Sequence, residues 1–356
     1  MVKTVFVGLS GGVDSAVSAA LLKDRGFNVV GVFIKIWQPE FIECTWATDR
    51  LDAMRVCVAL GIPFREIDLS ADYKRMVVED MIAAYSHGIT PNPDVLCNRH
   101  IKFGRFLNYA LREGADYIAT GHYARIGQGK RQKAKGKSLE LFRGADRNKD
   151  QSYFLYTLGQ QELARTLFPV GGLQKKEVRI LARQFGLPVA QKADSQGLCF
   201  VGDVSMKDFL SRYIKLESGH VLDPNGNIIG RHDGAALYTI GQRHGFNIER
   251  VAGERAPHYV ISVDIPSNSI RVSSRREDAS RKEAFIDEAR WIADVPPMPF
   301  RAQAQTRYRE HSSDAVIAET TGGVSIAFEE SHIAAPGQSL VIYDGEKCLG
   351  GGIIRK

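Results

Sequence analysis

The chain has 356 residues, of which 44% are hydrophobic and 25% are charged, and its formal net charge is +6 with a pI of about 9.0. This composition is typical of a globular protein with room for two or three domains, and the mild positive excess permits a polyanionic partner. No apolar run approaches the roughly 18 residues of a membrane span, and the start MVKTVFVGLSGG lacks the features of a secretion signal. We therefore expect a cytoplasmic protein without a membrane partner.

The first 125 or so residues alternate between predicted strands and helices. Strands are expected at 4–10, 29–36, 64–70 and 115–127, and helices at 14–26, 51–60, 72–86 and 100–114. This alternation predicts an α/β fold, with a parallel sheet covered by helices on both faces. Ligands of such sheets bind beyond the carboxyl ends of the strands.

The pattern changes at about residue 204. A short helix is expected at 205–214, and after it come short runs separated by turn signals such as DPNGN, IGQRHG and APGQS. Closely spaced turns are typical of small β modules. We therefore predict three domains: 1–203 (α/β), 204–276 (small, mostly β) and 277–356 (β-barrel-like).

The segment GLSGGVDS, residues 8–15, joins the first strand to the first helix. Gly11 and Gly12 allow a ligand to approach the backbone, and a helix N-terminus supplies unpaired N–H groups and a positive dipole end. Ser10 and Ser15 add hydroxyl donors. The segment predicts a phosphate cradle that follows neither GxxxxGK[ST] nor GxGxxG. A tight turn with a helix cap is the structural alternative.

The SGGxDS pattern resembles the pyrophosphatase-loop ATPases, which cleave ATP between its α and β phosphates and adenylate a substrate oxygen. The resemblance implies that Asp14 helps to place Mg²⁺ against the pyrophosphate. These enzymes include amide ligases, argininosuccinate, NAD and GMP synthetases, and enzymes of tRNA thiolation or lysidine formation. This motif alone does not choose among them.

Five cysteines without a CxxC pair or a zinc-like Cys/His spacing exclude a disulfide scaffold and a structural zinc site. Cys57 lies on the apolar face of a predicted helix, Cys348 lies near a terminal strand, and both are expected in the core. Cys44 stays undecided. Cys97, in NPDVLCNR, and Cys199, in KADSQGLCFVG, lie among turn-forming residues.

Cys97 and Cys199 are either inert buried thiols or a sulfur-handling pair. If they meet, one can carry a persulfide while the other attacks it and closes a disulfide. Cys97 stands at the mouth of the predicted helix 100–114, with Arg99 beside it, and both features would lower the pKa of the thiol.

Several segments together resemble the tRNA-specific 2-thiouridylases of bacteria and organelles. They appear in the family's order and span most of the chain: GLSGGVDS, TPNPDVLCNRHIKFG, ADYIATGHYAR, NKDQSYFLYTL, FPVGGLQKKEVRILA, DSQGLCFVG, YTIGQRHG and RYR. SGGxDS is shared with other enzymes, whereas NPDVLCN followed by SQGxCF is specific to this family. The resemblance implies an N-terminal adenine nucleotide α-hydrolase-like domain.

The resemblance also implies the reaction, which is the ATP-dependent 2-thiolation of the wobble uridine (U34) of tRNA. ATP adenylates the C2 oxygen, and sulfur from a persulfide then displaces AMP. Cys199 would hold the persulfide supplied by a sulfur-relay protein or a cysteine desulfurase. Cys97 would be the nucleophile, which either releases sulfide from that persulfide or closes a disulfide with Cys199 as sulfur transfers. Asp94 would act as acid or base.

The ligand contacts follow from the same resemblance. The expected ATP-binding residues are Gly8, Leu9, Ser10, Gly11, Gly12, Val13, Asp14, Ser15, Ile34 and Gly121. The expected tRNA-binding residues are Asn92, Pro93, Asp94, His122, Lys149, Asp150, Gln151, Arg307, Tyr308 and Gln338. The target base must leave the anticodon stack before its C2 can be reached, and Asn92 to Asp94 would receive it. Beyond Mg²⁺ with ATP, no metal is expected.

Some of these residues also have structural alternatives. His122 would equally suit a structural hydrogen bond, and a strand pattern would also produce Arg307–Tyr308. His100 and Ile34 depart from the acidic residue and the methionine usual in the family. The basic segment 130–137, KRQKAKGK, matches no family element.

Two other functions compete with tRNA thiolation. An adenylating enzyme acting on a small molecule would leave Cys97, Cys199 and the C-terminal β modules without a role. A non-catalytic RNA-binding protein would not need SGGVDS, Asp94 and both cysteines together.

Overall fold

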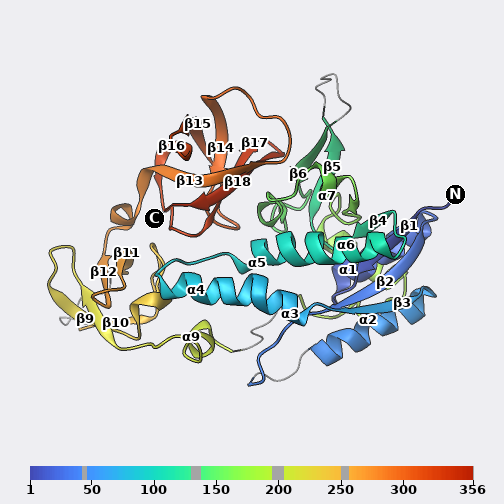
Figure 1. The fold of residues 1–356 in the computed structure, drawn as a ribbon, viewed down its shortest axis with the longest axis horizontal. Helices are drawn as coiled ribbons and strands as arrows, with labels where there is room; N and C mark the ends of the chain where they lie inside the picture. The colour runs from blue at the N-terminus through green and yellow to red at the C-terminus, as the bar shows by residue number, and fades with distance from the viewer. Residues whose placement is uncertain (42–45, 130–137, 195–203, 250–255, 356) are drawn as a thin grey trace.

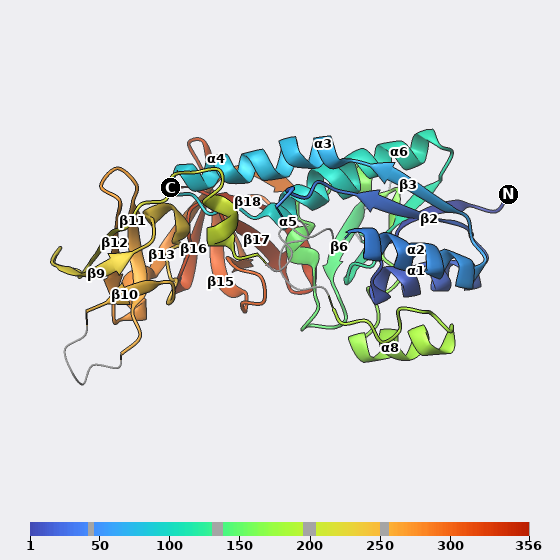
Figure 2. The same cartoon turned by 90° about the horizontal axis from the view of Figure 1, so that it is seen from below.

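The computed structural model describes residues 1–41, 46–129, 138–194, 204–249 and 256–355. Figures 1 and 2 show three sheets along the long axis of the molecule, with the parallel N-terminal sheet at one end, the central sheet at the other and the C-terminal sheet between them. The predicted fold class is confirmed. Within the described ranges, no helix has the length and apolar composition that a membrane span requires.

The N-terminal sheet is parallel, with the strand order β3-β2-β1-β4-β7. Its strands are β1 Thr4–Gly8, β2 Asn28–Lys35, β3 Phe64–Asp68, β4 Tyr117–Ala119 and β7 Thr166–Leu167. Successive residues of β1 face opposite sides, and both sides are buried: Val5 and Val7 pack in one core cluster and Phe6 in the other.

Helices cover both faces of this sheet, as Figure 2 shows. The cluster around Val5 and Val7 contains residues of α1 Val13–Asp24, α2 Trp46–Leu60 and α8 Lys175–Gln184. The cluster around Phe6 contains residues of α3 Ser70–Tyr73, η1 Lys74–Glu79, α4 Asp80–Ser86, α5 Pro93–Leu96, η2 Cys97–Phe106 and α6 Leu107–Arg112. The η1 and η2 segments are π-helical, a form that is frequent at functional sites.

The predicted start of the helix at 100 is wrong, because helical structure begins at Pro93. Asn92 caps it by accepting a hydrogen bond from the backbone N–H of Val95 at 3.3 Å, and Pro93 occupies the first helical position. Cys97 therefore lies at the start of η2, after one helical turn, rather than at the mouth of the helix.

The single strand predicted at 115–127 is also wrong. The chain leaves the parallel sheet after Ala119 and re-enters regular structure as β5 Ala124–Gln128, which pairs antiparallel with β6 Leu139–Arg143. Strand β6 then pairs with the C-terminal strand β18 Lys347–Ile354. The predicted division at 204 and 277 stays a prediction, and this hairpin links its first segment to its third.

The remaining elements are short helices and two further sheets. The helices are η3 Ser152–Phe154, α7 Gln160–Leu163, α9 Met206–Leu210, η4 Ala235–Leu237 and η5 Arg276–Ala279. The central sheet, ordered β10-β9-β8-β12-β11, contains β8 Gly219–Leu222, β9 Ile228–His232, β10 Phe246–Ile248, β11 Tyr259–Asp264 and β12 Ser269–Ser273.

The C-terminal sheet closes into a barrel, because its first strand, β13, pairs with both β16 and β18. The barrel strands follow the order β13-β16-β15-β14-β17-β18. Their bounds are β13 Arg281–Trp291, β14 Phe300–Gln305, β15 Ser313–Thr320, β16 Gly323–His332 and β17 Ser339–Asp344, with β18 as given above.

Candidate active site

The phosphate-cradle segment lies where the alternation predicted it, between the carboxyl end of β1 and the start of α1. Gly12 is the N-cap of α1, a 12-residue helix, and it provides no side-chain cap. The first N–H groups of this helix therefore have no capping side chain and are suited to binding an anion. The Ser15 hydroxyl accepts a hydrogen bond from the N–H of Ser10 and donates one to the Gly12 carbonyl, both at 3.2 Å. Gly11 has φ +71°, a conformation that favours glycine.

Asp14, in the first turn of α1, is held by two side chains from distant segments. The Tyr123 hydroxyl donates a hydrogen bond to its Oδ1 at 2.8 Å. Lys175 Nζ donates to both carboxylate oxygens, at 2.7 Å and 2.9 Å. Burial and then the negative charge of Asp14 raise the pKa of Tyr123. Tyr123 therefore stays a hydrogen-bond donor to the carboxylate at neutral pH.

Lys175 also joins a second carboxylate, Asp194, at 2.8 Å. Asp194 accepts further bonds from Lys149 and Arg179, each at 2.6 Å. Burial opposes ionisation of Asp194, but its hydrogen bonds from Lys149 and Lys175 outweigh burial and lower its pKa. A charged network therefore extends from the cradle to the last described residue before position 195.

These groups fit a nucleoside triphosphate with Mg²⁺. The uncapped N-terminus of α1 offers N–H groups to phosphate oxygens, and Lys175 supplies a positive charge beside them. Magnesium bound to a nucleotide usually takes one or two carboxylates and completes its shell with phosphate oxygens and water, and Asp14 offers such a carboxylate. Among the described residues, no cluster of three or more His, Cys, Asp or Glu side chains could hold a metal ion.

Ile34 and Gly121 both lie against this segment. A Cβ placed on Gly8 would lie 3.6 Å from the Ile34 side chain. A Cβ placed on Gly121 would lie 2.6 Å from the N atom of Ser15 and 2.8 Å from the carbonyl carbon of Asp14. The absence of a side chain at 121 therefore lets the loop after β4 contact the start of α1.

The segment 92–97 places an acid and a thiol on successive helical turns. Asp94 lies in the first turn of α5, and burial raises its pKa against the opposing charge of Lys102. Cys97 is buried, with 8% of its surface exposed, within the core cluster that also contains Val95 and Phe106. A carboxyl group with a raised pKa keeps its proton to a higher pH, which suits a role in proton transfer.

His122 is buried, and its Nδ1 lies 2.7 Å from the Thr120 hydroxyl. Its ring contacts those of Phe103 and Phe168 at centroid distances of 5.7 Å and 5.9 Å. Burial, with a smaller effect from Lys102, lowers the pKa of His122 well below its usual range. His122 is thus neutral and has the hydrogen bond that the structural alternative expects.

The segment 149–151 is tied into the protein. Asp150 forms an ion pair with Arg143 at 3.1 Å and accepts hydrogen bonds from the backbone N–H groups of Gly144 and Ser152. The Gln151 side chain accepts a hydrogen bond from the N–H of Tyr123 at 3.0 Å. This segment therefore braces the same Tyr123 that holds Asp14.

Three of the proposed tRNA contacts lie on the C-terminal side. Gln338 donates from Nε2 to the carbonyls of Thr90 and Pro91, at 2.7 Å and 3.3 Å, and so reaches the loop that precedes Asn92. Arg307 donates to the carbonyl of Ile240 at 2.7 Å. The ring of Tyr308 lies 4.4 Å from that of Phe154.

The five cysteines divide between core positions, the helix and undescribed segments. Cys57 and Cys348 are buried in the core, which confirms their predicted packing role. Burial raises the pKa of the Cys57 thiol to about 11. Cys199, Cys44 and the basic segment 130–137 lie outside the described residues.

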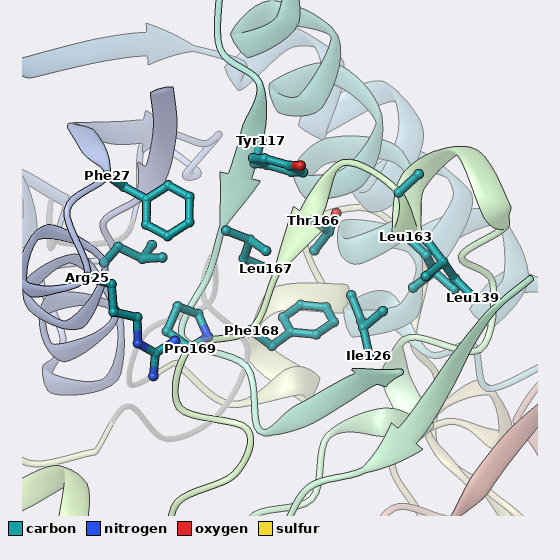
Figure 3. A pocket seen from close by; sticks show the side chains of 12 residues that line it. Arg25, Phe27, Tyr117, Ile126, Leu139, Leu163, Thr166, Leu167, Phe168 and Pro169 are labelled. Atoms are coloured by element: carbon teal, nitrogen blue, oxygen red, sulfur yellow. The ribbon is translucent and has the colours of Figure 1, made fainter. Parts of the chain in front are cut away.

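A cavity of about 370 Å³ lies apart from the charged network. Figure 3 shows it beside β7, with Phe27, Tyr117 and Phe168 among its lining residues. Its walls are mostly apolar and include neither Asp14 nor Cys97. This cavity is not the candidate active site.

Sequence reasoning missed four residues of the network: Tyr123, Lys175, Arg179 and Asp194. Each lies in or beside a motif that was identified, ADYIATGHYAR, FPVGGLQKKEVRILA or DSQGLCFVG. The signal for Lys175 was its place in the first turn of a well-capped helix after a Pro/Gly-rich turn, since Glu177 accepts from the Gln174 N–H at 2.6 Å. Nothing in the spacing showed that this helix faces α1.

Three family models match the chain in consecutive stretches. They are the tRNA methyl transferase HUP domain over residues 3–203, the tRNA methyl transferase PRC-barrel domain over 207–274 and the Aminomethyltransferase beta-barrel domain over 281–354. The chain is 45% identical over 366 residues to the tRNA-specific 2-thiouridylase MnmA of Acidovorax ebreus (strain TPSY), covering 98% of this chain and 97% of that protein. It is 46% identical over 358 residues to the tRNA-specific 2-thiouridylase MnmA of Stenotrophomonas maltophilia (strain R551-3), covering 98% and 93%.

Proposed function

The chain belongs to the tRNA-specific 2-thiouridylase family, and on that premise we propose that it catalyses the ATP-dependent 2-thiolation of the wobble uridine of tRNA. The observation that carries this proposal is the cradle at 8–15 with Asp14 held between Tyr123 and Lys175, on the same sheet as the helix that contains Asp94 and Cys97.

The cradle binds ATP in this proposal. The N-terminus of α1 and Lys175 hold the phosphates. Asp14 would hold Mg²⁺, and the ion would supply neutralisation of the charge on the pyrophosphate. The C2 oxygen of the uridine attacks the α-phosphate, so an O–P bond forms as the bond to pyrophosphate breaks. The products are an O-adenylated base and pyrophosphate.

Sulfur then replaces the adenylated oxygen. Cys199 carries the persulfide, whose outer sulfur attacks C2 so that AMP leaves with the oxygen. Cys97 attacks the Cys199 sulfur, which releases 2-thiouridine and leaves a disulfide that an external thiol must reduce. In the second route, Cys97 attacks the persulfide first and sulfide is the species that reaches C2. Asp94 moves the proton in either route.

The substrate and partners follow from this chemistry. Asn92, Pro93 and Asp94 receive the flipped base, and Gln338 positions their loop through Thr90 and Pro91. The other proposed tRNA contacts are His122, Lys149, Asp150, Gln151, Arg307 and Tyr308, of which His122 and Asp150 are buried. A sulfur-relay protein or a cysteine desulfurase loads Cys199, and the cytoplasm is the proposed location.

The test uses purified protein with tRNA, Mg-ATP and a persulfide source, and it measures 2-thiouridine and AMP together. We expect both products, each dependent on tRNA. AMP formation on a small-molecule acceptor without tRNA would instead assign the chain to small-molecule adenylation. Retention of tRNA without any ATP cleavage would leave only an RNA-binding role.

A further inference from the structure

A second, polar pocket lies between the helix that contains Cys97 and the C-terminal barrel. Its volume is about 800 Å³, within the range of ligand sites. One wall is the face of η2 and α6 that presents Arg99, His100 and Phe103, another is the segment 157–165, and a third is the end of β13. Cys97 and Asp94 are not among its lining residues.

The pocket gathers positive charge from three parts of the chain. Arg99 comes from η2, Arg165 follows α7, and Arg290 comes from β13. His100, also on η2, is mainly neutral at neutral pH, because burial and then the charge of Arg99 lower its pKa. Its lining contains one acid, Glu162, whose carboxylate accepts a hydrogen bond from the N–H of Gly159 at 2.8 Å as a helix cap. The basic side chains therefore outnumber the acidic ones.

Arg99 and Arg290 have no carboxylate within ion-pair distance among the described residues. Other arginines of comparable position are paired: Arg105, also on η2, pairs with Asp72 at 3.2 Å, and the buried Arg143 pairs with Asp150 at 3.1 Å. Burial and then the charge of Arg290 lower the pKa of Arg99, against smaller opposing effects of Tyr156 and Glu288. The two guanidinium groups thus repel each other, and an anion between them would relieve this repulsion.

The rest of the lining suits a nucleic acid better than a bare anion. Trp291, next to Arg290, lines the pocket while it also packs against the barrel core, with its ring 6.4 Å from that of Phe300. Stacking on aromatic side chains is a common mode of RNA recognition. The Thr157 hydroxyl is buried in the wall and has no hydrogen-bond partner among the described residues. Arginine binds phosphate oxygens with two parallel N–H donors.

We propose that the pocket between Arg99 and Arg290 binds a phosphodiester segment of the tRNA backbone, and this inference rests on the proposed function. Because Arg99 lies two residues after Cys97 and Arg290 belongs to the barrel, the bound backbone would join the reactive helix to the C-terminal domain. Such a contact positions the tRNA without reading its sequence.

The test measures the dissociation constant of tRNA from the full chain as a function of potassium chloride concentration. Arg99→Gln and Arg290→Gln are each expected to weaken binding roughly ten-fold and to reduce the slope of log K against log salt by about one. Arg99→Lys keeps the charge and is expected to recover the slope. Arg112→Gln is the matched control, since Arg112 is an exposed arginine of α6 outside the pocket.

Wild-type tRNA affinity and salt slope in the double variant Arg99→Gln/Arg290→Gln would overturn the proposal. The proposal would also be overturned if these substitutions abolished the binding of pyrophosphate in the absence of tRNA but left the affinity for tRNA unchanged. The pocket would then bind free phosphate. If the wild-type chain binds tRNA but does not thiolate it, while the variants still lose affinity, the proposed function fails and the pocket stands.

Discussion

Lys175 and Asp14 form a two-point contact across 161 positions of sequence, with Nζ at 2.7 Å and 2.9 Å from the two carboxylate oxygens. This contact places the start of α8 against the start of α1 at the mouth of the cradle. It also means that Asp14 has a cationic partner before any metal ion arrives.

Lys175→Met is expected to lower tRNA-dependent AMP release roughly 100-fold, as loss of a charge that stabilises a departing phosphate usually does. AMP release at varied ATP concentration gives kcat and KM for this variant. Lys176→Met is the matched control, because Lys176 is the next residue of α8 and is exposed. Wild-type kcat and KM for ATP in Lys175→Met would remove Lys175 from the phosphate site.

Gly121→Ala is expected to lower the free energy of unfolding by about 1–3 kcal/mol, because its Cβ would overlap backbone atoms that cannot rotate away. The same change should displace the start of α1 and reduce ATP cleavage. Gly172→Ala is the control, since a Cβ there meets nothing within 4 Å. Thermal unfolding of both variants measures the difference, and equal melting temperatures would contradict the close packing at 121.

Cys199→Ser is expected to block persulfide loading, whereas Cys97→Ser should still load sulfur but fail to turn over. The reason is that only one of the two thiols carries sulfur while the other releases it. Labelled-sulfur transfer to protein and to tRNA distinguishes the two steps. Cys57→Ala should retain both, since burial raises the pKa of Cys57 to about 11 and keeps its thiol protonated. Normal multiple turnover by Cys97→Ser would exclude Cys97 from the mechanism.

Asp94→Asn is expected to abolish most thiolation and yet to stabilise the fold at neutral pH. Burial raises the pKa of Asp94 above its unfolded value, so the folded state binds more protons than the unfolded state between the two values. Stability from this group is therefore fully present in acid and is lost as pH rises through the folded pKa. Urea unfolding at pH 4 and pH 7 should show the advantage of Asp94→Asn only at the higher pH.

Asp68→Asn is the control, because the stability contribution of Asp68 depends on pH in the opposite direction to that of Asp94. Hydrogen bonds from Lys35 and then Ser70 lower the pKa of Asp68 to about 2. Its contribution is present above the unfolded pKa and is lost as pH falls through about 2. Asp68→Asn should therefore be the less stable chain at pH 7. The same pH dependence for both variants would contradict the assignment of Asp94 as a buried acid.

Much of the fold follows from local sequence patterns. The βα alternation predicts the parallel sheet, and the glycines after the first strand predict the cradle, because both depend on neighbouring residues. The start of the helix at Pro93 could also have been predicted, since Asn92-Pro93 is a cap followed by a first-turn proline. With the helix beginning at Pro93, Cys97 follows the first helical turn instead of preceding the helix.

The remaining features depend on contacts between distant segments. No periodicity shows that Lys175 reaches Asp14 or that Gln338 reaches Thr90. The family resemblance is confirmed by the matches over nearly the whole chain. The roles of Asp94, Cys97 and Cys199 stay predictions, because their chemistry depends on an approach between segments that helix and strand patterns do not encode.

The pairing of β6 with β18 has a consequence for how the protein is made. Phe142 pairs with Lys347, so the edge of a hairpin near the middle of the chain meets its partner only when the last strand leaves the ribosome. At about 5–20 residues per second, synthesis of the roughly 200 intervening residues takes on the order of 10–40 s. During this interval the newborn nucleotide-binding region has an open strand edge, which invites pairing with other chains. A chain that stops before β18 would therefore keep the strand edge of β6 unpaired and be prone to aggregation, although it contains every residue of the cradle.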